Sequence, residues 1–389
     1  MSLDLNKARE LFESSTDFTV GLEEEFQILD RDTLELTPRF GELYDAAQED
    51  EDLEVSVAGE LISSEIEIRS GRGENFPHAV ALQEVHREKL FKLAGDHGVR
   101  LGAIGAHPWS RWQDQSIIDT EHYRRVEDGL RYVAWRNNTF SLHVHVGVKG
   151  ADRAIAVSDR VRELLPELLA VSASSPFTEG RDSGLASART QLFTRMFPRC
   201  GIPEPFGDWR GYQDFVEFLI RTNSVVESTQ LWWSVRPHHL YGTIEVRICD
   251  AQPKGHDSTA LAGLIVACVA QAARDHDEGV ELKPKTGMAL EENLWRAIRF
   301  GLEGKMIDLD RGEEYPAAAI ADRLLGWTAP VRAELGIEPQ LPKHGATAWL
   351  REQAADFDGT PDMQMREAFR LAVDATAASY GGSEATAPV

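Results

Sequence analysis

Cysteine is scarce in this 389-residue chain, which has three, at positions 200, 249 and 268. No two of them form a C-x-x-C pair and their number is odd, so neither a disulfide framework nor a thiolate zinc site is indicated. Reduced thiols and a cytoplasmic location are therefore expected. Long hydrophobic runs are lacking as well. The most apolar stretch, 260–273, is shorter than the about 20 residues that span a bilayer. It predicts a core helix, and the charged N-terminal residues do not resemble a signal peptide.

Lysine is also rare, because only nine of the 41 basic residues are lysines. With 64 acidic residues the formal net charge is −23, which argues against nucleic-acid backbones and anionic membrane surfaces as partners. An anionic substrate would need metal ions or a local cluster of arginines. Acidity with little lysine is typical of a saline habitat but also follows from base composition, and both explanations stay open.

Several catalytic motifs are missing. The one Gly-Lys pair, Gly304-Lys305, is followed by Met306, so there is no G-x-x-x-x-G-K-[ST] phosphate-binding loop. There is no H-E-x-x-H, no G-x-S-x-G and no kinase H-R-D motif either. A nucleotide would therefore have to be held in another way, such as by metal ions on a sheet.

Hydrophobic periodicity predicts an α+β fold. Alternation with the period of two of a β-strand marks 19–30, 62–69, 139–148 and two short strands around a turn within 231–250, and a further strand is predicted at 99–104. Helices are predicted at 4–14, 39–47, 76–97, 120–135, 153–173, 256–277, 287–303, 316–325 and 346–379. The acidic run 49–52 is interpreted as a solvated turn. No repeat or linker is found, so 1–379 is expected to form a single domain with an antiparallel sheet backed by helices, followed by a disordered tail at 380–389.

The opening strand places three consecutive carboxylates inside an otherwise buried segment. Glu23 and Glu25 share one face, about 6 to 7 Å apart, where each raises the pKa of the other unless a cation lies between them. Glu24 points to the apolar face and is expected to pair with an arginine. An isolated E-x-E is more often a solvated strand face, so the metal interpretation depends on the other strands.

Three other strands repeat this design. Their apolar residues alternate with Glu67, with His143 and His145, and with Glu245 and Arg247. Carboxylates and imidazoles are the ligand types of divalent metals, and a carboxylate-rich set suits Mg²⁺ or Mn²⁺. A zinc site would require both histidines as ligands. On the same alternation, Cys249 is expected on the polar face, as a packed rather than a reactive thiol.

Arginines accompany this set. Arg236 and Arg247 flank the turn before the last strand, and Arg195 and Arg199 lie at a proline- and glycine-rich loop, 198–205, that is a candidate lid. Divalent cations beside guanidinium groups form a cradle for a polyphosphate. The residues alone leave open an enzyme that transfers phosphoryl groups, a two-metal phosphohydrolase, and a non-catalytic nucleotide- or amino-acid-binding protein.

Five segments, taken together and in order, resemble the carboxylate-amine ligase branch of the glutamate–cysteine ligases, which is related to glutamine synthetase. The segments are G-L-E-E-E-F at 21–26, E-L-x-x-S-x-x-E at 60–67, H-V-H-V-G at 143–147, R-P-H-x-x-Y-G-T-I-E-V-R at 236–247 and N-x-W-R-A-x-R-x-G at 293–301. The resemblance extends from about 18 to 305. It implies a curved antiparallel sheet whose concave face holds ATP and Mg²⁺ or Mn²⁺.

The resemblance also implies roles for individual residues. The implied metal ligands are Glu23, Glu25, Glu60, Glu67, His143 and Glu245. The implied catalytic arginines are Arg236 and Arg247, and the implied nucleotide- or substrate-binding residues are His145, Arg247, Arg195 and Asn293. Glu60 and Glu67 are seven positions apart, which puts them on opposite faces of a regular strand, so a bulge or loop must intervene if both are ligands.

The implied activity is an ATP-dependent ligation of small molecules. The γ-phosphoryl group of ATP passes to the side-chain carboxylate of glutamate, and an amine, expected to be that of cysteine, displaces phosphate to give γ-glutamylcysteine. A homo-oligomer is the expected assembly, since symmetric oligomers are common among soluble proteins.

Overall fold

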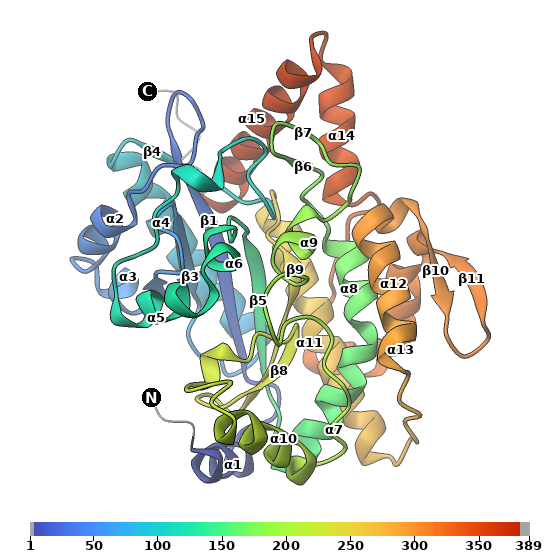
Figure 1. The fold of residues 1–389 in the computed structure, drawn as a ribbon. Helices are drawn as coiled ribbons and strands as arrows, with labels where there is room; N and C mark the ends of the chain where they lie inside the picture. The colour runs from blue at the N-terminus through green and yellow to red at the C-terminus, as the bar shows by residue number, and fades with distance from the viewer. Residues whose placement is uncertain (1–3, 382–389) are drawn as a thin grey trace.

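A seven-stranded antiparallel sheet forms the centre of the computed structural model, which describes residues 4–381 (Figure 1). Its strands are β1 (Val20–Asp30), β2 (Val57–Ala58), β3 (Glu65–Arg69), β4 (Val99–Gly102), β5 (Ser141–Gly147), β8 (Val235–His238) and β9 (Thr243–Asp250). They are ordered β2-β3-β1-β5-β9-β8, and β4 pairs with β1. Two hairpins lie apart from this sheet: β6 (Phe177–Thr178) with β7 (Arg181–Asp182), and β10 (Lys305–Asp308) with β11 (Glu313–Pro316). The predicted α+β fold, an antiparallel sheet backed by helices, is confirmed.

Helices make up most of the rest of the chain. They are α1 (Leu5–Glu13), α2 (Phe40–Ala47), α3 (Glu51–Ser56), α4 (Phe76–Asp96), α5 (Glu121–Leu130), α6 (Tyr132–Trp135), α7 (Ala151–Val161), α8 (Leu165–Ser172), α9 (Ala188–Leu192), α10 (Trp209–Arg221), α11 (Gly255–Asp277), α12 (Gly287–Phe300), α13 (Ile320–Leu335), α14 (Ala346–Asp356) and α15 (Pro361–Tyr380). Short 3-10 helices are η1 (Trp112–Asp114), η2 (Arg162–Leu164), η3 (Ser228–Gln230), η4 (Gly301–Glu303) and η5 (Ala317–Ala319). The expectation that residues 1–379 form one domain stays a prediction.

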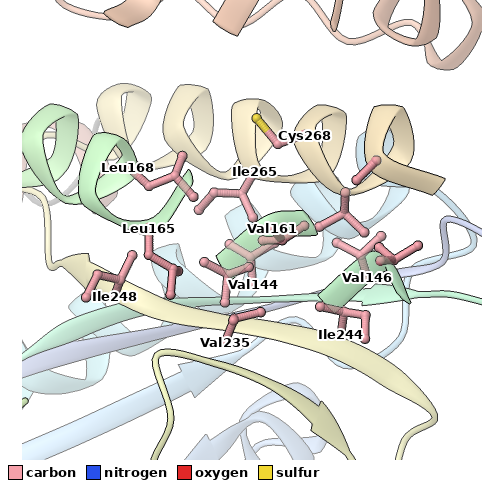
Figure 2. Close-up of a cluster of buried hydrophobic side chains, with 14 of the residues drawn as sticks. Val144, Val146, Val161, Leu165, Leu168, Val235, Ile244, Ile248, Ile265 and Cys268 are labelled. Carbon is pink, nitrogen blue, oxygen red and sulfur yellow. The ribbon is translucent and has the colours of Figure 1, made fainter. Parts of the chain in front are cut away.

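The apolar face of the sheet is covered by α7, α8 and α11, with α12 and α13 outside them (Figure 1). Valine and isoleucine side chains of β5, β8 and β9 meet leucine and isoleucine side chains of these helices in one buried cluster, part of which is drawn in Figure 2. Burial of each such side chain stabilises the folded state by roughly 1.5–3 kcal/mol relative to leaving it exposed. The strands are β-branched on this face because branched side chains pack well on a pleated surface.

A second apolar cluster covers the other end of the same face. There α4 packs on β1, β3 and β4, α15 packs on β4, and α2 packs on α4 and β2. Phe26 of β1 belongs to this cluster. Phe26 makes edge-to-face contacts with Phe91, at 5.3 Å between ring centroids, and with Tyr380, at 5.2 Å. The two clusters together hold β1 in place along its whole length. β1 is the strand that carries the consecutive carboxylates.

Glu24 lies on this apolar face of β1 and is paired with an arginine. Arg87 of α4 donates Nε to Oε2 and Nη2 to Oε1 of Glu24, both at 2.6 Å, and Gln83 Nε2 donates to Oε2 at 2.9 Å. Burial by itself raises the pKa of Glu24, but the charge and hydrogen bonds of Arg87 outweigh it and lower the pKa. The prediction that Glu24 points away from Glu23 and Glu25 and meets an arginine is confirmed.

Helix α11 contains the apolar stretch 260–273 and is the core helix that the sequence predicted. By length and composition it is the one helix between residues 4 and 381 that is apolar enough to cross a membrane. Its apolar 18-residue stretch is 83% buried inside the protein.

Three segments differ from the sequence prediction. The acidic run 49–52 is not only a turn, because the Asp50 carboxylate accepts the backbone N–H groups of Asp52 (2.9 Å) and Leu53 (3.2 Å) and so caps α3. The long C-terminal helix is broken at 357–360, where Thr360 caps a new helix that begins with Pro361. The hairpin of β10 and β11 separates α12 from α13, so the helix expected at 316–325 instead spans 320–335.

The boundary of the expected tail is also wrong. Tyr380 ends α15, is 4% exposed and donates its hydroxyl to the backbone oxygen of Gln252 at 2.8 Å. The rest of the expected tail, 382–389, lies outside the described residues.

Candidate active site

The polar faces of β1, β3, β5, β8 and β9 line a cavity of about 290 Å³. Antiparallel register aligns its carboxylates and histidines, because side chains directly opposite each other share a face. Glu25 is opposite Glu67, Glu23 is opposite His143, and His145 is opposite Glu245. The structure therefore brings together the residues that were expected from the four alternating strands.

A β-bulge in β9 interrupts the alternation of side chains after Arg247, which lines the cavity. The register of β5 and β9 shifts between Leu142 and Val144, so that Cys249 is opposite Leu142 on the apolar face. Cys249 is fully buried in the large apolar cluster, and its expected place on the polar face is wrong. Alternation fails here because a bulge adds one residue to one strand of the pair.

Arg189 of α9 holds the bulge in place. Its Nη1 donates to the backbone oxygen of Ile248 at 3.0 Å and its Nη2 to that of Arg247 at 3.1 Å. Arg189 is 2% exposed and also lines the cavity. Sequence reasoning missed this residue, because a buried arginine on a short helix carries no periodic signal.

Two groups of side chains have the geometry of cation ligands. Glu23, His143 and Glu245 bring one ligand atom each within 4.8 Å of one another, and so do Glu25, Glu67 and His143. Carboxylate oxygens with one imidazole are a donor set for a divalent cation such as Mn²⁺, and the all-oxygen part suits Mg²⁺. The residues present therefore fit the divalent ions that the sequence predicted.

The acidic side chains of this cavity repel one another, and burial and this repulsion shift their pKa values. Burial raises the pKa of Glu67 well above its ordinary value, and Glu23 and Glu60 raise it further. Burial and the charge of Glu25 raise the pKa of Glu65 in the same way, and they raise that of Glu60 to about 7. Like charges in a buried site hold protons unless cations compensate them, so a cation bound here would displace protons.

Glu245 is instead held ionised. Burial by itself raises its pKa, but Arg236, Arg247 and His145 together lower it well below the ordinary value. Arg236 Nε donates to Glu245 Oε2 at 2.6 Å, and Arg247 Nη1 donates to Oε1. His143 is kept neutral, because burial and the charge of Arg247 lower its pKa.

Glu60 reaches the cavity from a loop. β2 ends at Ala58 and β3 begins at Glu65, so the segment between them is not a regular strand, and Glu60 and Glu67 both line the cavity. The loop that the seven-residue spacing required is present. Glu65, which was not among the proposed ligands, lines the cavity too and was detectable from the same alternation as Glu67.

Two predicted nucleotide-binding residues lie elsewhere. Arg195 does not line the cavity and pairs with Glu291 of α12. Asn293 uses its amide on the backbone of Ile307, donating to the oxygen and accepting from the nitrogen, both at 2.8 Å, and so fastens β10 to α12. Their roles in nucleotide binding stay predictions that this arrangement does not support. The candidate lid 198–205 does not line the cavity either.

The wall that faces the carboxylates is apolar. It comes from the loop before β3, from α5 and from the segment between α9 and β8, and consists of Leu61, Val126, Phe193, Phe197 and Trp232. These residues belong to a third buried cluster, separate from the two on the other face of the sheet. Such a wall limits the access of water to the ionised groups.

A second cavity, of about 480 Å³, adjoins the first. Both are lined by Glu23, Arg69 and Tyr241, and His145 lines the second. The ring of Tyr241 stacks on His238 at 4.4 Å between centroids. His145 Nδ1 lies 3.0 Å from Thr243 Oγ1, and its Nε2 lies 3.3 Å from Glu23 Oε1. His145 thus reaches the first cavity through its contact with Glu23, which lines both.

Comparison with known proteins agrees with this geometry. The model of the glutamate–cysteine ligase family 2 matches residues 19–342, which include every residue of the two ligand groups. The chain belongs to the glutamate–cysteine ligase family 2. A family relative from Sorangium cellulosum, provisionally named glutamate–cysteine ligase 2, is 38% identical over 326 residues, which are 84% of this chain and 87% of the relative. A relative from Solibacter usitatus with the same provisional name is 35% identical over 355 residues, which are 90% of this chain and 88% of the relative.

Solved structures share the fold of this family member at low sequence identity. A glutamate–cysteine ligase from Francisella tularensis in complex with AMP matches with a TM-score of 0.67 at 14% identity, covering 96% of this chain and 91% of that one. A bifunctional glutathione synthetase from Pasteurella multocida matches with a TM-score of 0.63 at 14% identity, covering 96% of this chain and 53% of that one. The solved structures show a shared fold, and the family identifies a ligase of the carboxylate–amine type.

Proposed function

We propose that this protein is an ATP-dependent glutamate–cysteine ligase that forms γ-glutamylcysteine through a γ-glutamyl phosphate. The observation that carries the proposal is the meeting of two cation-ligand groups with Arg236 and Arg247 in one cavity of a glutamate–cysteine ligase family member. Such a site can hold two anionic substrates together. The AMP complex of the Francisella tularensis enzyme supports an adenine nucleotide as one of them.

The proposed reaction has two steps, a phosphoryl transfer and an acyl transfer. A γ-carboxylate oxygen of glutamate attacks the γ-phosphorus of ATP, an O–P bond forms, the bond to the bridging oxygen breaks and ADP leaves. The nitrogen of the acceptor amine then attacks the γ-carbonyl carbon, and phosphate leaves with the oxygen that came from glutamate. The nitrogen loses one proton, and no covalent bond to the protein forms.

The residues of the cavity supply charge and position. Arg236 and Arg247 stabilise negative charge on the transferring group, and both are pre-oriented by hydrogen bonds to Glu245. Glu23, His143 and Glu245 would hold one divalent ion, and Glu25 and Glu67 with Glu60 would hold another. Such ions would neutralise phosphate charge. The apolar wall excludes water, which would hydrolyse an acyl phosphate.

The nucleotide is proposed to enter the 480 Å³ cavity. His145 and Arg69 stand on its border with the carboxylates, and an anionic phosphate chain directed from there toward the first cavity would reach both ligand groups. Glutamate and the amine would then occupy the 290 Å³ cavity, with the acceptor side chain against the apolar wall. This arrangement gives His145 the nucleotide-facing role that the resemblance implied.

The proposed function is tested by measuring ADP release with Mg²⁺ or Mn²⁺ and a panel of amines. We expect ADP only when ATP, glutamate and an acceptor are all present, with cysteine the best acceptor. ADP release that needs no amino acid would instead identify a two-metal phosphohydrolase. ATP binding without turnover under any combination would identify a nucleotide-binding protein.

A further inference from the structure

Ser141, the first residue of β5, lies between the two ligand groups and belongs to neither. It is 3% exposed and lines the cavity. Its backbone N–H and its hydroxyl both donate to Glu25 Oε2, at 2.5 and 2.6 Å. Its Oγ also lies 2.8 Å from His143 Nε2. One small side chain therefore contacts a carboxylate of one group and the histidine that both groups share.

The direction of these hydrogen bonds follows from the groups that take part. Glu25 Oε2 accepts the backbone N–H of Ser141 and is therefore the acceptor in this contact, and a hydroxyl has one hydrogen to donate. The hydroxyl hydrogen of Ser141 therefore points at Glu25, and the remaining lone pairs of Oγ face His143. The ring nitrogen Nε2 of His143 must then carry the hydrogen of this contact.

The other ring nitrogen lies between a donor and an acceptor. His143 Nδ1 lies 3.5 Å from Arg247 Nη1, which can only donate, and 3.3 Å from Glu23 Oε2. With the hydrogen on Nε2, the lone pair of Nδ1 accepts from Arg247. Nδ1 and Glu23 Oε2 then face each other as two acceptors across a gap that a cation would bridge.

We propose that Ser141 is a positioning residue that fixes the tautomer of His143 and thereby separates the two cation sites. With the hydrogen on Nε2, the imidazole can coordinate only through Nδ1, on the side of Glu23 and Glu245. The group around Glu25 and Glu67 keeps oxygen ligands alone. The inference rests on the cation sites of the proposed function, but not on the identity of the substrates.

The separation gives the two sites different chemistry. An imidazole with two carboxylates suits Mn²⁺ and other transition metals, whereas an all-carboxylate group suits harder ions such as Mg²⁺. The same hydroxyl holds the Glu25 carboxylate, so its removal affects both sites. Residues that orient a ligating histidine typically change metal affinity 10–100-fold when they are replaced.

The tautomer is tested first, on metal-free protein labelled with ¹⁵N-histidine. NMR distinguishes a ring that carries hydrogen on Nε2 from one that carries it on Nδ1, and loss of the signal in a His143→Gln variant identifies the residue. We expect hydrogen on Nε2 in the wild-type protein. Hydrogen on Nδ1 would overturn the proposal, and this result does not depend on ATP, glutamate or any ligase activity.

Metal binding is tested second, by titrating the same protein with Mn²⁺ alone. Ser141→Ala should weaken the tighter Mn²⁺ site by about 10–100-fold and allow the other tautomer to appear. Ser141→Thr keeps the hydroxyl and should restore both readouts. Ser158→Ala removes an equally buried serine, on α7, and should change neither.

Unchanged Mn²⁺ affinity and an unchanged tautomer in Ser141→Ala would contradict the proposal. If that variant does not fold, the wild-type tautomer still decides it. A ligation assay that finds no ADP release while the tautomer and the Mn²⁺ result hold would reject the proposed function and leave the role of Ser141 standing.

Discussion

Replacing Glu23 by glutamine is expected to lower kcat/KM for ligation at least about 100-fold. Glu23 stands where the two cavities meet and is the carboxylate of β1 in the group with His143 and Glu245. A glutamine of the same shape has no charge and is a poor ligand for Mg²⁺ or Mn²⁺. ADP release at saturating metal, glutamate and cysteine measures the effect, and a Mn²⁺ titration shows whether the loss follows metal binding.

The matched control for this variant is Glu49→Gln, which removes an exposed carboxylate outside the cavity. We expect it to retain wild-type ligation. A Glu23→Gln protein that folds normally and retains more than about a tenth of the wild-type kcat/KM would show that this carboxylate is not a ligand during catalysis.

Replacing Arg87 by methionine is expected to destabilise the fold by about 3–5 kcal/mol. The Glu24 and Arg87 side chains are 4% and 5% exposed, so removal of the guanidinium leaves an ionised carboxylate buried between two apolar clusters. Urea unfolding at neutral pH measures the change in the free energy of unfolding.

A second substitution separates the loss of the ion pair from the loss of packing. Glu24→Gln combined with Arg87→Met removes the unpaired charge while keeping an acceptor for Gln83, and the double variant should be more stable than Arg87→Met alone. Arg210→Met, at an exposed arginine of α10, should change stability by less than about 0.5 kcal/mol. A cost below about 1 kcal/mol for Arg87→Met would contradict the role of this pair.

The face of the sheet that carries the site was predictable from the sequence. A strand has a fixed period of two, so one buried residue such as Phe26 determines where Glu23, Glu24 and Glu25 point. The charge of Glu24 on the apolar side then required a partner, and Arg87 is that partner. These conclusions use only local geometry and the cost of burying a charge.

Features that depend on tertiary contacts were not predictable. The bulge that turns Cys249 to the apolar face is stabilised by Arg189, which lies about 60 residues away in the chain. Asn293 fastens a hairpin that has no alternating pattern. In the sequence, Ser141 cannot be distinguished from an ordinary small strand residue. Its hydrogen bond to Glu25 becomes evident only when β1 and β5 are paired.

The most direct test of the proposed activity follows one oxygen atom. Ligation is run with glutamate whose γ-carboxylate is labelled with ¹⁸O, and the released inorganic phosphate is analysed by mass spectrometry. An acyl phosphate route predicts one ¹⁸O atom in each phosphate formed, because the amine displaces phosphate together with an oxygen of glutamate. Phosphate without ¹⁸O, released as fast as ADP, would mean that water attacks ATP and would contradict the ligase mechanism.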